Sequence, residues 1–84
     1  MYMPFQNTHS PYEVPDEYLD PKITSAHSKQ TMFGMIKFMD QAVLNVTTAM
    51  KSLGMWDNTL LVFSADNGGE VTAAGNNYPL RGGE

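Results

Sequence analysis

The fold of this chain is decided by residues 39–69, MDQAVLNVTTAMKSLGMWDNTLLVFSADNGG, in which a helical pattern gives way to an uninterrupted apolar run. Apolar residues recur at steps of three and four, which predicts a helix over residues 29–53 with one apolar face. Four methionines on this face would suit a partner's groove, but we expect the face to pack on a core. Its members are Met32, Met35, Ile36, Met39, Val43, Val46, Met50 and Leu53.

Both ends of the predicted helix carry terminal signals. Ser28 stands where a side chain can cap the first turn, and Gly54 stands where a glycine commonly ends a helix. Lys51 lies in the last turn, where the helix dipole favours a positive charge. We therefore expect a helix with a Ser28 cap and a Gly54 stop.

The apolar run after the helix predicts a strand. Residues 57–59 form a polar turn, and residues 60–64, LLVFS, follow without polar alternation. A short apolar run of this kind is typical of a strand that is covered on both faces, as in a parallel sheet flanked by helices. We expect Phe63 to be buried in such a sheet.

The whole chain predicts an α/β class with one repeat of strand, loop, helix and strand. Three prolines exclude a long helix from the loop, although a short helical turn is predicted at residues 15–19. One such unit cannot cover both faces of its own sheet, so residues 1–84 are predicted to be a partial domain of a larger protein. The predicted order is a strand at 1–6, a loop at 7–28, the helix at 29–53, the strand at 60–64 and a trailing loop.

Composition excludes several function classes. The net charge is −4 and no lysine or arginine cluster exists, which disfavours a nucleic acid partner. The chain has no cysteine, so disulfides, thiolate metal sites and cysteine nucleophiles are excluded within it. No stretch resembles a signal peptide, and no apolar run is long enough to span a membrane.

Polar side chains follow both predicted strands. Asp66 and Asn67 come after the second strand, with Gly68 and Gly69 behind them to allow a sharp turn and close approach of a ligand. Ligands of open α/β sheets bind at the carboxyl ends of the strands, and carboxylate and amide oxygens suit Ca²⁺ or Mg²⁺. The alternative is an Asx-type turn. His9 follows the first strand, where it could contact an anion or donate a proton, or be an ordinary surface imidazole.

Three stretches together resemble the type I sulfatase family, in particular its arylsulfatase B-like branch (N-acetylgalactosamine-4-sulfatase and relatives). Residues 2–19, YMPFQNTHSPYEVPDEYL, resemble that branch's first strand and Gln-x-x-His loop. Residues 39–69 resemble its helix, sequon and Asp-Asn-Gly-Gly strand exit, and residues 74–83, AGNNYPLRGG, resemble the next loop. The resemblance runs nearly end to end. It implies a fragment of an alkaline-phosphatase-like domain with a mainly parallel sheet.

The resemblance implies roles for individual residues in sulfate-ester hydrolysis. Asp66 and Asn67 match ligands of a divalent cation, Ca²⁺ rather than Mg²⁺, which holds the sulfate. His9 matches a histidine that contacts the sulfate near the leaving oxygen. Residues 81–84 read RGGE, so the position of a sulfate-contacting lysine holds Glu84, whose charge would repel a sulfate.

One family element is missing. The nucleophile of sulfatases is a formylglycine made from the first residue of a Cys/Ser-x-Pro-x-Arg motif, and this chain has no cysteine and no Ser-x-Pro. We therefore expect the 84 residues alone to be inactive and to be a fragment of an enzyme that acts on a sulfated glycan or an aryl sulfate. The alternatives are a catalytically dead short product with a binding or regulatory role, or a free-standing calcium-binding module.

A glycosylation sequon lies on the predicted helix. Asn45-Val46-Thr47 matches Asn-x-Thr, and Asn45 falls off the apolar face, where a glycan would have room. Sequons also occur by chance, but the resemblance favours glycosylation in a lysosomal or secreted parent enzyme.

Overall fold

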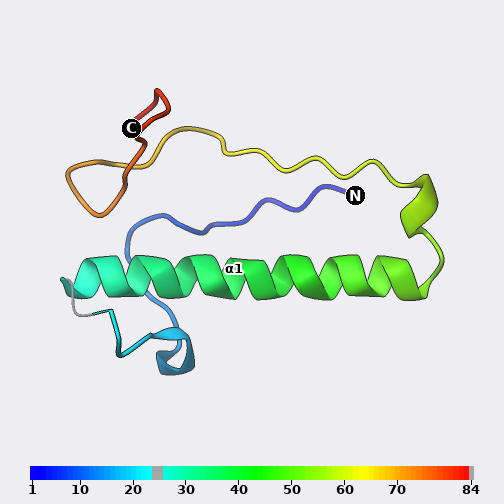
Figure 1. The fold of residues 1–84 in the computed structure, drawn as a ribbon, viewed down its shortest axis with the longest axis horizontal. Helices are drawn as coiled ribbons and strands as arrows, with labels where there is room; N and C mark the ends of the chain where they lie inside the picture. The colour runs from blue at the N-terminus through cyan, green and yellow to red at the C-terminus, as the bar shows by residue number, and fades with distance from the viewer. Residues whose placement is uncertain (24–25, 84) are drawn as a thin grey trace.

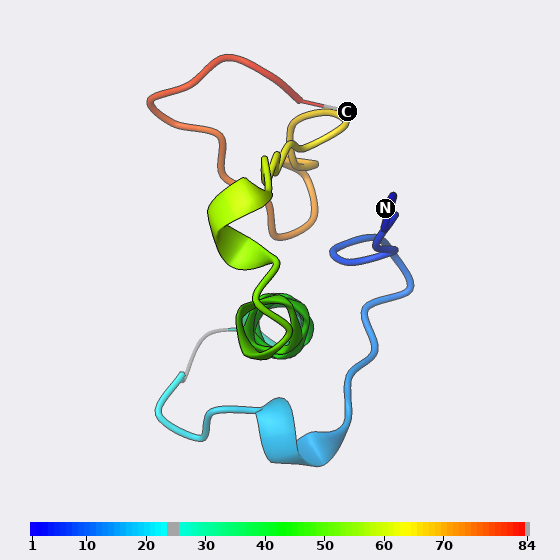
Figure 2. The same cartoon turned by 90° about the vertical axis from the view of Figure 1, so that its right-hand side faces the viewer.

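The computed structural model describes residues 1–23 and 26–83. Helix α1 (His27–Ser52) is the main element, with a short 3₁₀ helix on each side, η1 (Asp16–Tyr18) and η2 (Trp56–Asn58). The N-terminal segment and the segment after η2 both run along the same side of α1 (Figures 1 and 2). The helix is therefore the axis around which the rest of the chain is arranged.

The predicted helix is confirmed, but its start is not where the sequence placed it. α1 begins at His27, and the residue at its N-cap is Ala26, which has no side chain able to cap. The carbonyl of Ala26 accepts the first helical bonds from the amides of Lys29 and Gln30, at 2.9 and 3.2 Å. The predicted Ser28 cap is wrong because Ser28 already lies inside the first turn.

The end of α1 follows the glycine prediction. Gly54 has a φ of 65°, in the left-handed region that glycine adopts without steric cost. Its amide donates to the carbonyl of Lys51, and the amide of Met55 donates to the carbonyl of Met50. These two bonds form a Schellman motif, which satisfies the last carbonyls of the helix. Lys51 places its ammonium 4.7 Å from the centroid of the Trp56 ring, so it also makes a cation–π contact.

The loop before α1 packs on the N-terminal half of the helix. The short helical turn predicted at residues 15–19 is confirmed as η1, and the ring of Tyr18 meets that of Phe38 edge-on at 5.1 Å. Gly34 is buried where they meet, because a Cβ at this position would lie 2.8 Å from Cγ1 of Val14 and 3.2 Å from the carbonyl oxygen of Tyr18. The glycine thus lets the loop approach the helix closely.

The two predicted strands are not formed. The structure contains no β-strand within residues 1–23 and 26–83, and no backbone hydrogen bond joins residues 1–6 to residues 60–64 in those ranges. A strand needs a neighbour that pairs with its amides and carbonyls, and this part of the chain supplies none. Phe63, which we expected to be buried, is 67% exposed. The mainly parallel sheet is therefore not confirmed.

Little of the apolar surface is buried. The radius of gyration is 15.0 Å, whereas a compact chain of this length would have about 12 Å. The accessible surface is 6985 Å², against about 5,000 Å² for a compact monomer of this mass. On the apolar face of α1, Met35 is buried and Leu53 is 73% exposed, with the other six members half-buried. The expected core thus forms only at the N-terminal half of the helix.

Candidate functional site

The predicted cation ligands lie at a bend in the exposed part of the chain. Asp66 and Asn67 are both exposed, and Oδ1 of Asp66 accepts a 2.9 Å bond from the amide of Asn67. This bond reaches the next residue, whereas an Asx turn joins a side chain to the residue two positions on. Nδ2 of Asn67 donates to the carbonyl of Gly68 at 2.7 Å, a bond that leaves the side-chain oxygen as the atom suited to a cation. The hydrogen bonding therefore differs from that of the Asx-turn alternative.

The residue that shapes this bend is Asn77, which our sequence analysis did not single out. Oδ1 of Asn77 accepts a 2.8 Å bond from the amide of Gly69, and its Nδ2 donates a 2.7 Å bond to the carbonyl of the same glycine. The backbone carbonyl of Asn77 also accepts a 2.7 Å bond from the amide of Leu80. One side chain thus ties the Asp-Asn-Gly-Gly stretch to the Asn-Asn-Tyr-Pro-Leu-Arg stretch.

Two glycines allow the loop to close on itself. A Cβ on Gly68 would lie 2.9 Å from Oδ1 of Asn77 and 2.7 Å from the carbonyl carbon of Gly82, and it would also collide with the amide of Gly83. A Cβ on Gly75 would lie 2.7 Å from the carbonyl oxygen of Glu70. In this structure the chain's own backbone approaches Gly68 closely, and the predicted approach of a ligand stays a prediction.

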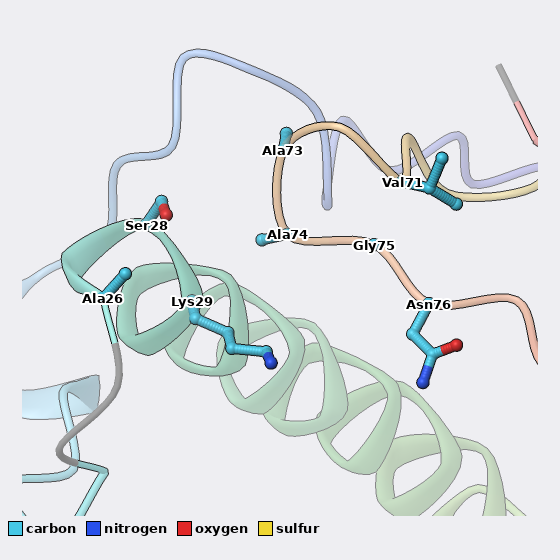
Figure 3. A pocket seen from close by; sticks show the side chains of 8 residues that line it. All are labelled: Ala26, Ser28, Lys29, Val71, Ala73, Ala74, Gly75 and Asn76. Atoms are coloured by element: carbon cyan, nitrogen blue, oxygen red, sulfur yellow. The ribbon is translucent and has the colours of Figure 1, made fainter.

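A cavity of about 340 Å³ lies between the loop and the first turn of α1 (Figure 3). Ala74 is buried there, and the side chains of Lys29 on the helix and Asn76 on the loop both line the space between them. The loop and the first turn of α1 thus border one pocket. The lining residues are Ala26, Ser28, Lys29, Val71, Ala73, Ala74, Gly75 and Asn76.

His9 is exposed and directly follows the turn at residues 7–8. Its Nδ1 is 2.7 Å from the carbonyl oxygen of Ser10. A carbonyl oxygen only accepts, so Nδ1 is the donor in this bond. The predicted contact of His9 with a sulfate stays a prediction.

The described residues do not form a metal site by themselves. Within residues 1–23 and 26–83, no three histidine, aspartate or glutamate side chains are grouped so that they could hold a metal ion. Asp66 and Asn67 offer the hard oxygens that Ca²⁺ prefers, but Ca²⁺ takes about six to eight oxygens. The pair thus fits a cation as part of a larger shell. The prediction for Glu84 lies outside the described residues.

The predicted glycosylation residue is exposed on α1. Oδ1 of Asn45 accepts a 3.0 Å bond from Nε2 of Gln41, one turn earlier. The hydroxyl of Thr47, the third residue of the sequon, donates to the helix backbone. The side chain of Asn45 is therefore accessible to solvent.

In the described part of the chain, no helix is both long enough and apolar enough to cross a bilayer.

Comparison with known proteins identifies the family of the chain. The family model described as Sulfatase matches residues 1–84, the whole length. The chain belongs to the sulfatase family. It is 36% identical over 83 residues to Arylsulfatase J of Mus musculus and 26% identical over 84 residues to the uncharacterized sulfatase YdeN of Escherichia coli strain K12. Each match covers 98% of this chain and 14% of the relative.

Membership of the sulfatase family supports the coarse predictions from the sequence. Sulfatases act on sulfate esters and generally use a metal ion. The chain spans about a seventh of the length of the two relatives. The similarity to Arylsulfatase J supports an arylsulfatase relationship. The arylsulfatase B-like branch and the identity of the metal are finer points, and they are taken up as proposals.

Proposed function

We propose that this sulfatase chain supplies the cation-holding loop and a sulfate-contacting histidine to an enzyme that hydrolyses sulfate esters. The observation that carries the proposal is the pair of bonds between Asn77 and Gly69, which joins two separate sulfatase-like motifs into one loop. This loop keeps the side chains of Asp66 and Asn67 exposed to solvent rather than packed in the chain. The proposed enzyme is of the arylsulfatase B-like type, acting on a sulfated glycan or an aryl sulfate.

Asp66 and Asn67 would hold the cation, for which we propose Ca²⁺. A bound cation would supply positive charge that orients the sulfate and stabilises negative charge as the S–O bond breaks. The proposal needs further oxygen ligands from outside these residues, because two side chains are fewer than Ca²⁺ requires. The described residues would contribute two side-chain oxygen ligands and the bend that exposes them.

His9 would act on the substrate rather than on the cation. The resemblance places a sulfate-contacting histidine at this position, where an imidazole could contact a sulfate oxygen or pass a proton to the leaving oxygen. The nucleophile must come from elsewhere, since the chain lacks cysteine and the Ser-x-Pro pattern. Residues 1–84 alone are therefore proposed to be inactive, because orientation and a cation do not replace the covalent step.

The test is the substitution Asp66→Ala in a complete sulfatase that carries these residues. Asp66 is exposed, so its loss opens no cavity, and we expect the melting temperature in EDTA to stay near the unsubstituted value. Turnover of a chromogenic aryl sulfate and bound calcium should both be lost, because an anionic ligand of a divalent cation is removed. Exposed Glu70→Ala, with an acid removed four residues away, is the matched control and should keep both.

Two results would contradict the proposal. The first is an Asp66→Ala enzyme that keeps its calcium and its turnover, which would make the bend a turn without a role in cation binding. The second is reproducible hydrolysis of an aryl sulfate by the purified 84-residue chain, abolished by His9→Ala, which would show that no further nucleophile is needed.

We also propose that Asn45 carries a glycan in a parent enzyme that enters the secretory pathway and works in the lysosome or outside the cell. The proposal is supported by the exposure of Asn45 on α1. Glycosidase treatment should increase the gel mobility of the unsubstituted protein, and Asn45→Gln should remove this shift. The conservative control Thr47→Ser keeps the sequon and should keep the shift. Unchanged mobility after treatment of the unsubstituted protein would contradict glycosylation at this position.

A further inference from the structure

We propose that Asn77 is a positioning residue that holds the cation-ligand pair in place, an inference that rests on the proposed function. Asn77 is half-buried, and its side-chain amide makes two bonds of 2.7 and 2.8 Å to the one residue Gly69. Two bonds to a single residue fix both the position and the orientation of its peptide groups, as a bridge between antiparallel strands does. The cross-link spans eight residues of chain.

The cross-link acts where the cation ligands are displayed. Gly69 follows Asp66 and Asn67 after one residue, Gly68, so fixing Gly69 limits how far the two ligands can move. A side chain at position 68 would have no room beside Asn77, because a Cβ there would lie 2.9 Å from Oδ1 of Asn77. Asn77 therefore restricts the bend through its two bonds to Gly69.

The same residue reaches toward the other half of the loop. The carbonyl of Asn77 accepts the amide of Leu80 at 2.7 Å, next to Arg81. The backbone of Gly82 also lies against that of Gly68. The bend is therefore in contact with the segment that follows Asn77 as well as with Asn77 itself. Loss of the amide of Asn77 would free the bend to sample other shapes, of which few present the ligands together.

The experiment measures Ca²⁺ affinity rather than turnover. In a complete sulfatase that carries this chain, we expect Asn77→Ala to raise the half-saturating Ca²⁺ concentration about 10- to 100-fold, the range typical of residues that orient metal ligands. Asn76→Ala is the matched control, since Asn76 is an exposed amide whose side chain bonds only locally, to the amide of Tyr78. It should keep the unsubstituted Ca²⁺ affinity.

A purely structural role gives a different pattern. If Asn77 only stabilises the fold, Asn77→Ala will lower the melting temperature in EDTA and leave the Ca²⁺ affinity unchanged, and that result overturns the inference. We expect the melting temperature in EDTA to fall no more than in Asn76→Ala, while the increase in melting temperature on adding Ca²⁺ becomes smaller.

A second measurement needs no substitution, and it tests the positioning role of Asn77 even if Asn77→Ala does not fold. Coupling between two sites is reciprocal, so if the Asn77 bonds favour cation binding, Ca²⁺ must favour those bonds. Hydrogen exchange of the Gly69 amide in the unsubstituted enzyme should then be slower with Ca²⁺ than in EDTA. Equal exchange rates in the two conditions overturn the inference.

The proposed function and this inference fail in distinguishable ways. If Asp66→Ala keeps the unsubstituted Ca²⁺ affinity, the cation site is not at this bend and both fail. If Asp66→Ala loses Ca²⁺ but Asn77→Ala binds it as tightly as the unsubstituted enzyme, the proposed function stands and only the positioning role of Asn77 is overturned.

Discussion

Helix α1 and the segment that follows it, residues 59–83, are stabilised in different ways. The helix satisfies its own backbone groups, ends in a Schellman motif at Gly54, and packs against the loop that precedes it. The following segment leaves Leu60, Val62 and Phe63 more than half exposed, and its bonds between Asn77 and Gly69 join residues eight positions apart. The proposed cation ligands, Asp66 and Asn67, lie in this second region. The region whose structure follows from its local sequence, α1, is thus not the region that carries the proposed cation ligands.

The largest expected effect tests whether the exposed segment is covered in a complete domain. Phe63→Ala should lower the free energy of unfolding of a complete sulfatase by about 3–5 kcal/mol, as expected if a sheet buries the ring. In the 84-residue chain, where Phe63 is 67% exposed, the change should be below about 0.5 kcal/mol. Urea denaturation of both proteins measures the difference. A small effect in both would show that the segment stays uncovered and that the predicted strand is wrong in the whole enzyme too.

A smaller effect tests the local character of the helix end. Gly54 has a φ of 65°, and an L-residue in this region costs about 1–2 kcal/mol, so Gly54→Ala should destabilise by that amount. Gly54→Asn is the matched control, since asparagine tolerates this conformation better, and its loss should be smaller. Thermal melts followed by circular dichroism should give similar losses in the chain and in the complete enzyme. A loss confined to the complete enzyme would show that the helix end is not locally determined.

The smallest effect concerns the contact between the helix and the loop before it. Alanine normally stabilises a helix by about 1 kcal/mol relative to glycine. At Gly34 this gain is opposed by overpacking against Val14 and Tyr18, which typically costs about 1–3 kcal/mol. Gly34→Ala should therefore destabilise by about 1 kcal/mol as a net result of the two terms.

The control for Gly34→Ala is Thr48→Ala, at an exposed position of the same helix. This substitution gains helix propensity without a clash, so the melting temperature should stay the same or rise slightly. If Gly34→Ala raised the melting temperature as much as Thr48→Ala does, the loop would not be packed tightly against α1 at Gly34.

Local patterns were sufficient to predict α1 and η1 from the sequence. The period of the apolar residues gave the helix to within a few residues at each end, and Gly54 ends it because glycine adopts a positive φ without strain. Ser28 misled because the helix begins at His27, so the N-cap position falls on Ala26, and no side chain caps the first turn. The position of a helix start is therefore less strongly encoded than its existence.

Structure that needs distant partners could not be read in the same way. The apolar composition of residues 60–64 indicates a tendency to be covered, but a strand forms only when another strand pairs with it, and none is present in the described ranges. Asp66 and Asn67 were singled out by residue type and stay a prediction as ligands. Asn77 was missed because Asn76 and Asn77 are adjacent and identical, and only the folded loop shows which of them reaches Gly69.

The contact between Lys51 and Trp56 makes the end of α1 optically visible. Trp56 is the single tryptophan of the chain, and the ammonium of Lys51 lies 4.7 Å from its ring centroid. A positive charge at this distance changes the electric field at the indole, so its fluorescence reports on whether the last helical turn is intact. Asp66 is ten positions further along the chain. In the 84-residue chain, emission from this one ring can therefore follow unfolding of the helix separately from events at the bend.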